Sequence, residues 1–457
     1  MEKRMGNRDF SKYITLSVLG MLGSSGTILA DTFFIANKLG ADGLAALNLS
    51  VSVFGLINGL GMMLGIGGAA RYAICKSKGE NQEADRTFTL ALLTAVFCGV
   101  VLNICGTLFS GPMVRLLGAD SHIFPMCQSY LRTVLCFAPF FILNHFFIAF
   151  LRNDGSPKLA MTAMLMGSLC NIVLDYLLIY PMDMGMFGAA FATGCAPVIG
   201  LLTSSIHILT RKNQFHPVKT KISWKEIRKF SGLGISAFIN EFSSGFVLVV
   251  LNLLILHMTG TVGVAAYGII ANLALIALAV FTGISQGIQP LISRAYGQDD
   301  RRLLQNLYQK GLWTASVIGV LFFGIAWIWT GNLVSVFNSE RDMTLQIIAE
   351  NGLRIYFSGF LLVGGSFVTT AFFSATEKAK EAFVTSFFRG FAGILMTAVL
   401  SAFLWGLTGV WISFGITEGI TVLICWFLMR RKRVVYIKTQ RIDLRRIILR
   451  KLKSRWI

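Results

Sequence analysis

Twelve long apolar segments occupy most of this chain of 457 residues, and they restrict the folds open to it. A helix needs about 20 residues to cross a ~30 Å hydrocarbon core, and each segment is long enough. Inside lipid the backbone must satisfy its own hydrogen bonds, which favours helices. We therefore predict an all-α integral membrane protein. Its twelve transmembrane helices are expected at 13–37, 44–74, 87–110, 124–151, 158–182, 185–210, 230–257, 263–293, 303–331, 345–375, 381–405 and 407–429.

The basic residues indicate how these helices are oriented. Most of the 41 Lys and Arg lie in alternate loops and at the two chain ends, whereas the opposite loops hold only Lys38, Arg115 and Arg341. Because cytoplasmic loops are enriched in Lys and Arg, both termini are predicted to be cytoplasmic in a plasma or inner membrane. The net charge of +19 is then a topology signal. We expect membrane lipids as neighbours and no nucleic acid as a partner.

An internal repeat divides the chain into two halves. Segment 131–160 aligns with 353–382 at an offset of 222, 184–190 with 405–411 at 221, and 39–46 with 259–266 at 220. Six spans per half make the repeats parallel, an arrangement typical of transporters with a cavity between two bundles. We predict an N-terminal six-helix lobe (1–212), a basic cytoplasmic linker (213–227), a C-terminal six-helix lobe (228–430) and a basic tail (431–457). The tail is expected to lie on anionic lipid as an amphipathic helix, with a disordered arm as the alternative.

Four of the 22 acidic residues lie deep inside predicted spans, where an ionised carboxylate is costly and commonly functional. They are Asp31, Asp175, Glu241 and Glu418. At ~1.5 Å per residue, Asp31 and Asp175 both lie ~10 Å below the outer surface. Asn171 is one helical turn from Asp175, and Thr193 in the next span reaches a similar depth.

This layer of oxygen-bearing side chains predicts a site for a coupling cation or proton. Carboxylate and amide oxygens of Asp31, Asn171 and Asp175 suit a hard cation such as sodium. Paired carboxylates instead raise each other's proton affinity, which suits proton exchange. The alternative is a helix-to-helix hydrogen bond worth ~1 kcal/mol.

The C-terminal half carries a second set of candidates, for a cavity or substrate contact. Glu241 and Glu418 lie near the middle of their spans, and each either faces a cavity or makes a buried structural hydrogen bond. Arg389 lies about nine residues into its span and either pairs with one of these acids or contacts substrate.

Taken in order, several segments resemble the multidrug and toxic compound extrusion (MATE) transporters over nearly the whole chain. They are ADTFFIANKLGADGLAALNLS (30–50), GIGGAARYAICKSKGENQEAD (65–85), LRNDGSPKLAM (151–161), NIVLDYLLI (171–179), GMFGAAFAT (185–193), VAAYGI (264–269) and GISQGIQPLISRAYG (283–297). The DNA-damage-inducible-F-like branch looks most similar. In that branch the resemblance implies an N-lobe coupling site at Asp31, Asn171, Asp175 and Thr193. One departure is the first span, YITLSVLGMLG, which lacks the proline that many members carry there.

The resemblance implies a secondary active multidrug efflux transporter that exports amphipathic, cationic compounds by sodium- or proton-coupled antiport with alternating access. We expect a monomer with no cofactor beyond the coupling ion. A lipid-linked oligosaccharide or lipid flippase of the same superfamily is the alternative, although such proteins commonly have more spans and more cavity arginines. A membrane enzyme is disfavoured because no HExxH or clustered-acid motif is present.

Overall fold

The computed structural model describes residues 6–338 and 342–453, with side chains described up to Arg430. Within these ranges the regular structure is helical, with no strand. Arg341 and the side chains of the basic tail lie outside the described part, so the prediction for the tail surface stays a prediction. The helices are α1 (Asn7–Ser77), α2 (Asn81–Leu116), α3 (Phe124–Cys136), α4 (Ala138–Asn153), α5 (Pro157–Ile179), α6 (Gly185–Leu209), α7 (Trp224–Gly297), α8 (Arg301–Ile328), α9 (Thr330–Ser335), α10 (Met343–Ser358), α11 (Phe360–Ala375), α12 (Ala379–Phe387), a π-helix (Phe388–Ala392) and α13 (Gly393–Lys453).

Twelve apolar crossings account for these helices. Seven long helical stretches have the length and composition to span a membrane, and three of them contain two crossings separated at Gly40, Gly260 or Gly406. Two further crossings are bent pairs, α3 with α4 at 49° and α10 with α11 at 42°. The predicted all-α membrane fold is therefore confirmed.

The backbone breaks recur at equivalent positions of the two halves, as the sequence repeat predicts. A left-handed φ, which L side chains rarely adopt, marks the same turns in each half. The equivalent breaks are Gly40 with Gly260 (φ 65° and 67°), Gly185 with Gly406 (54° and 58°), Gly155 with Glu377 (90° and 57°), and the bends at Phe137 and Gly359. Because the positive φ recurs even where Glu377 replaces glycine, it supports the repeat at the level of chain geometry.

A substitution at one of these turns tests whether the turn geometry matters. Gly260→Ala should lower the free energy of unfolding by about 1 kcal/mol, because an alanine Cβ is strained at a φ of 67°. Nothing lies within 4 Å of the Cβ that alanine would add, so crowding makes no contribution. Thermal unfolding in detergent measures the loss. Gly260→Asn should cost a similar amount, because at ψ −155° the backbone lies outside the left-handed helical region that asparagine tolerates. Equal midpoints for wild type and Gly260→Ala would contradict the turn assignment.

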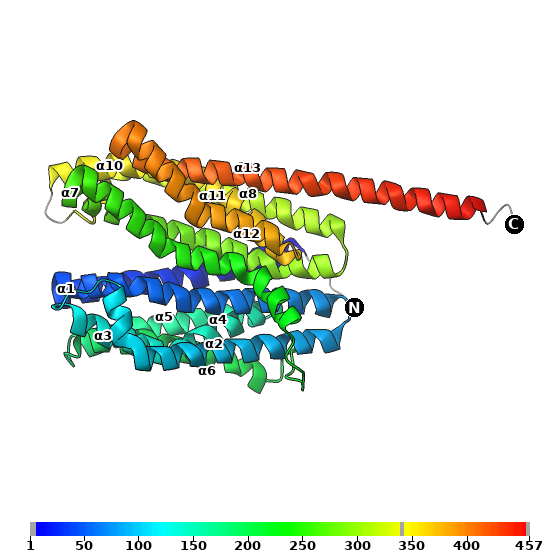
Figure 1. Cartoon of the computed structure of the whole chain (residues 1–457), viewed down its shortest axis with the longest axis horizontal. Helices are drawn as coiled ribbons and strands as arrows, with labels where there is room; N and C mark the ends of the chain where they lie inside the picture. The colour runs from blue at the N-terminus through cyan, green and yellow to red at the C-terminus, as the bar shows by residue number, and fades with distance from the viewer. Residues whose placement is uncertain (1–5, 339–341, 454–457) are drawn as a thin grey trace.

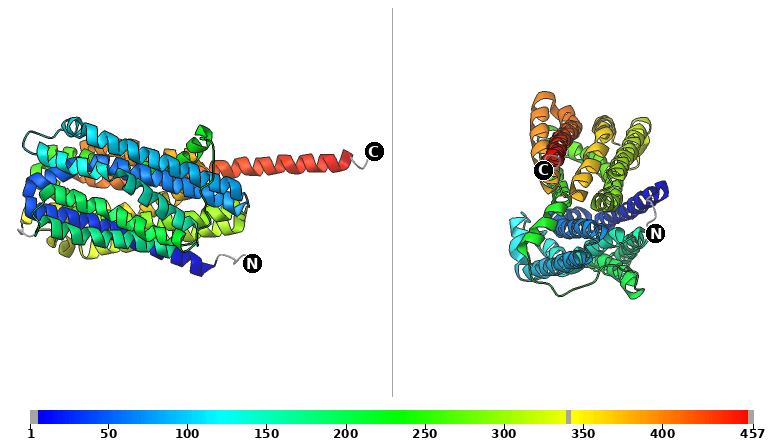
Figure 2. Two further views of the ribbon diagram at one scale, coloured as in Figure 1. Left: turned by 90° about the horizontal axis from the view of Figure 1, so that it is seen from below. Right: turned by 90° about the vertical axis from the view of Figure 1, so that its right-hand side faces the viewer.

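The two halves form two layers, each with its own apolar core. Figure 1 shows α1–α6 below and α7–α13 above, and the end-on view of Figure 2 shows the same two groups. One buried cluster is centred on Phe88, Phe146 and Phe150, and another on Phe281 and Phe360. The lobe boundaries proposed from the sequence stay a prediction, but each layer buries its own aromatic side chains.

Long helices α1 and α7 join the layers through close backbone contacts. A Cβ on Gly234 would lie 1.9 Å from the carbonyl oxygen of Met63, and one on Gly67 would lie 2.0 Å from that of Phe230. The first half of α1 packs in the same way on the second half of α7, where a Cβ on Gly283 would lie 2.6 Å from the Cα of Val18. Small residues allow this close approach of helices in a membrane.

Both described chain ends lie at the same end of the bundle, which we call the basic end (Figure 1). It also carries the turns 78–80, 154–156 and 298–300 and the extended segment 210–223. The backbone of α13 continues beyond the bundle from this end, along the long axis of the molecule (Figures 1 and 2). This common end is the one that the positive-inside rule predicts to be cytoplasmic.

Candidate ion-coupling site

The four N-lobe residues predicted from the sequence come together from three helices. Asp31 lies on α1, Asn171 and Asp175 lie one turn apart on α5, and Thr193 lies on α6. All four are buried, with exposed fractions of 8%, 0%, 0% and 6% in that order. Close packing of α5 on α6 helps this convergence, because a Cβ on Gly167 would lie 2.8 Å from the Ala196 carbonyl oxygen.

Asp31 is the centre of the hydrogen-bond cluster. Asn171, with its amide oriented so that both of its polar atoms are satisfied, donates from Nδ2 to Asp31 Oδ1 at 2.8 Å. Its Oδ1 accepts the backbone N–H of Thr193 at 3.1 Å. The Thr193 hydroxyl lies 3.4 Å from Asp31 Oδ2, and a side-chain hydrogen bond joins the Asp31 and Asp175 carboxyl groups. A hydrogen bond between two carboxyl groups requires that one of them carries a proton.

The direct contact of two carboxyl groups in this cluster fits a shared proton. The Asn171 oxygen accepts one hydrogen bond, from Thr193, and the two carboxyl groups contact each other directly. Asp175 Oδ1 is buried without a hydrogen-bond partner, so the cluster keeps one free acceptor. We find no group of three or more acidic, His or Cys side chains with metal-binding geometry among the described residues. Sodium binding at Asp31, Asn171 and Asp175 stays a prediction.

Tyr130 is a member of the cluster that the sequence analysis did not identify. It lies on α3, its side chain is 4% exposed, and it lies close to Thr193, within electrostatic range of both acids. Its depth in the span was the one available signal, but tyrosine is common in membrane helices and the residue has no acidic charge. Tyr130 extends the cluster to a fourth helix.

A second buried polar cluster lies in the C-terminal half. Arg389 is held in the π-helix, where Nε lies 3.8 Å from Glu418 Oε1 and Nη2 donates to Asn240 Oδ1 at 2.9 Å. The guanidinium also covers the Phe367 ring at 3.9 Å, and the Ser366 hydroxyl donates to Glu418 Oε2 at 2.5 Å. The sequence left open whether Arg389 pairs with an acid or contacts substrate, and in this structure it lies beside the acid Glu418.

Removing the charge of Arg389 alone should lower the stability of the protein more than removing the charges of both Arg389 and Glu418. Arg389→Met leaves the buried Glu418 carboxylate with Ser366 as its hydrogen-bond donor, which should cost about 1–3 kcal/mol of stability. Arg389→Met with Glu418→Gln removes the unpaired charge and should recover part of the loss. Thermal unfolding of the two variants provides the comparison. A double variant less stable than Arg389→Met would show that the pair is not coupled.

Glu241 occupies a different environment from Glu418. Its side chain is partly exposed, and the described contacts give it no hydrogen bond or ion pair. It lies on α7 between Phe238 and Phe242, whose rings stack with centroids 5.7 Å apart and an interplanar angle of 10°. The ring centroid of Phe391 in the π-helix lies 6.3 Å from the ring centroid of Phe242. An unpaired carboxylate beside stacked aromatic rings is suited to a planar organic cation.

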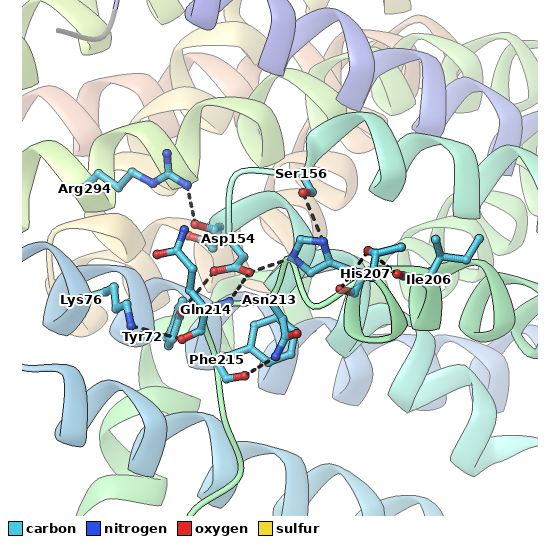
Figure 3. A network of polar contacts seen from close by, with 12 residues as sticks. Tyr72, Lys76, Asp154, Ser156, Ile206, His207, Asn213, Gln214, Phe215 and Arg294 are labelled. Carbon is cyan, nitrogen blue, oxygen red and sulfur yellow. Dashed lines mark hydrogen bonds and ion pairs between the residues drawn. The ribbon is translucent and has the colours of Figure 1, made fainter. Parts of the chain in front are cut away.

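A further polar network lies at the basic end, on residues that the sequence analysis did not identify. Figure 3 shows Asp154 at its centre, accepting from the Tyr72 hydroxyl (3.1 Å) and the backbone N–H of Gln214 (2.9 Å). His207 Nε2 lies 2.8 Å from the same carboxylate. Phe215, 1% exposed, stacks on a buried ring of α2. These contacts hold segment 210–223 against the N-terminal half.

Comparison with known proteins identifies the class. The MatE family model matches residues 17–177 and 237–399, one segment in each half. The chain therefore belongs to the MatE family, as the sequence motifs predicted. The DNA-damage-inducible-F-like branch stays a prediction.

Particular relatives cover almost the full length of the chain. It is 26% identical over 423 residues to the multidrug export protein MepA of Staphylococcus saprophyticus, covering 91% of this chain and 92% of that protein. It is 25% identical over 398 residues to MepA of Staphylococcus aureus strain MRSA252, covering 86% and 87%. The flippase alternative gains no support from these likenesses.

Solved structures share the fold. A crystal structure of a MATE in complex with MaL6 has a TM-score of 0.87 at 22% identity, covering 94% of this chain and 97% of that one. An outward-facing multidrug resistance MATE transporter of the MOP superfamily has a TM-score of 0.87 at 23% identity, covering 96% and 100%. A MATE in the straight conformation also reaches 0.87, over 94% and 96% at 22% identity. The first span here is helical without a break before Gly40.

Proposed function

We propose that this protein exports amphipathic organic cations from the cell by proton-coupled antiport. The observation that carries the proposal is the buried carboxyl pair of Asp31 and Asp175, joined by a hydrogen bond and without a described Lys or Arg partner. A buried acid pair in a transporter commonly exchanges protons with the medium. The likeness to multidrug export proteins supports export as the direction and drugs as the substrate class.

Proton exchange at the pair would act on the lobes through α1. Asp31 ties α1 to α5 and α6, while Val18 and Ile14 of the same helix pack on Gly283 and Gly287 of α7. A change in the protonation of the pair alters the hydrogen bonds that hold α1 to the N-terminal half. Because α1 also contacts the C-terminal half, the change can bias how the halves pack. Coupling then requires only that protons and substrate prefer different states.

The substrate is proposed to bind where aromatic rings and an unpaired acid lie together. Glu241 supplies a negative charge, and Phe238 and Phe242 supply flat apolar surface. Ethidium is planar, cationic and apolar, so it fits this surface and serves as a test substrate. Arg389 and Glu418 neutralise each other nearby and leave Glu241 as the charge available to a cation.

Ethidium efflux from vesicles containing the purified protein tests the proposal. A proton gradient and a sodium gradient are imposed separately, with empty vesicles as the control. We expect export under the proton gradient and none above the control under the sodium gradient. Export driven by sodium alone would transfer the coupling role to that ion. No export under either gradient would contradict the proposed function.

A further inference from the structure

The two lobes make directional polar contacts at the basic end. Arg152 of α4 donates to Gln286 of α7, and Asn153 Nδ2 donates to Gln289 Oε1 at 3.2 Å. All four side chains are buried, with exposed fractions of 3–9%. Each bond joins the N-terminal half to the C-terminal half, so separating the lobes at this end would leave buried polar groups without partners.

One arginine reaches from the N-terminal half into a turn of the C-terminal half. Arg71 of α1 is 8% exposed, and its Nη1 lies 2.7 Å from Glu377 Oε1 in the turn between α11 and α12. Glu377 has a φ of 57°, which costs a non-glycine residue about 1–2 kcal/mol. The equivalent turn in the N-terminal half has Gly155 at this position. A glutamate in a conformation that favours glycine indicates that its side chain has a role.

A second arginine makes the reciprocal contact. Arg294 of α7 donates from Nη2 to the Asn153 carbonyl oxygen at 2.5 Å, at the turn between α4 and α5 (Figure 3). Its guanidinium also faces the Tyr13 ring of α1 at 6.0 Å. A Cβ on Gly155 would point toward Arg294 Nη2 at 3.7 Å, so a longer side chain in this turn would crowd the guanidinium. The turn that receives Arg294 is the repeat equivalent of the turn that receives Arg71.

We propose that Arg71 with Glu377 and Arg294 with the Asn153 carbonyl form a reciprocal clamp that holds the basic end of the two lobes closed. Each lobe contributes one arginine and one accepting turn. The clamp rests on the proposed alternating access, because opening the basic end requires both contacts to break. Asp154, next to Asn153, also holds segment 210–223, so the turn that accepts Arg294 is fixed to the N-terminal half on its other side.

Distances between spin labels at the basic end test the clamp. Labels are attached at Glu80→Cys and Lys380→Cys, two exposed positions on opposite lobes, in a background with the eight native cysteines replaced. Pulsed electron resonance on the reconstituted full chain gives the distance distribution. The variants are Glu377→Gly, which suits the backbone of that turn, and Arg294→Gln. Lys78→Gln, an exposed basic residue at the same end, is the control.

We expect the population with widely separated labels to rise about fivefold or more in each clamp variant. Arg71→Glu with Glu377→Arg restores the ion pair once Lys229, which lies 3.8 Å from Glu377, is also changed to Gln. This triple variant should return the distribution toward wild type. Unchanged distributions in both single variants would overturn the clamp, as would an equal shift in Lys78→Gln. Because the readout is a distance, it does not depend on transport. A shift without ethidium export would keep the clamp and reject the proposed function.

Discussion

Asp31→Asn and Asp175→Asn should each lower proton-driven ethidium export by about 10- to 100-fold. An amide cannot release a proton near neutral pH, so either change removes the exchange step. The amide also replaces the hydrogen bond that shares a proton between the two carboxyl groups, and a change of about 1.5–3 kcal/mol corresponds to a rate change of this size. Initial rates of efflux from vesicles with equal amounts of inserted protein give the comparison.

Asp183→Asn is the matched control for this prediction. Like Asp175, Asp183 is an aspartate near the end of the span formed by α5. Unlike Asp175, its side chain is 76% exposed and pairs with Lys38. An exposed ion pair contributes little, so this variant should export at the wild-type rate. Near-normal export in Asp31→Asn and Asp175→Asn would move the coupling site away from the N-terminal half, with Glu241 as the next candidate.

Gly234→Ala should lower the stability of the protein by about 3 kcal/mol or more. The added Cβ would lie 1.9 Å from the Met63 carbonyl oxygen, and a backbone atom cannot turn aside as a side chain can. The strain must be relieved by moving α7 away from α1, which opens the contact between the lobes. Overpacking at a tight contact reaches or exceeds this cost. The midpoint of thermal unfolding in detergent measures it.

Gly268→Ala on the same helix separates crowding from helix propensity. Nothing lies within 4 Å of the Cβ that it would add, and alanine favours helix over glycine by up to about 1 kcal/mol. This variant should therefore be as stable as wild type or more stable. Equal thermal unfolding midpoints for Gly234→Ala and Gly268→Ala would contradict the close contact of α1 and α7.

Hydropathy and charge were sufficient to predict the crossings, because membrane thickness and the cost of buried backbone groups leave few alternatives. The repeat predicted the equivalence of the turns at Gly40 and Gly260, which share a left-handed φ. Depth in the membrane also predicted that Asp31, Asn171, Asp175 and Thr193 lie together, since residues at one depth on adjacent helices can meet. Their role in coupling stays a proposal.

Contacts set by helix rotation and by loops were not predictable in this way. Tyr130 joins the N-lobe cluster only because α3 turns that face toward α6, and no spacing in the sequence specifies the rotation. Asp154 and His207 lie at the ends of different helices and contact each other directly, while segment 210–223 folds back onto the same carboxylate. The pairing of Arg71 with Glu377 spans 306 positions and depends on how the lobes pack. Such pairings require the three-dimensional arrangement.

Proton movement evoked by substrate tests the central claim most directly. Vesicles containing the protein enclose a pH-sensitive dye, and ethidium is added with no imposed gradient of protons or sodium. Wild type should move protons opposite to ethidium, and Asp175→Asn should show both movements reduced by about 10- to 100-fold. Ethidium transport without a proton signal in wild type, or a full proton signal in Asp175→Asn, would contradict proton coupling through the Asp31 and Asp175 pair.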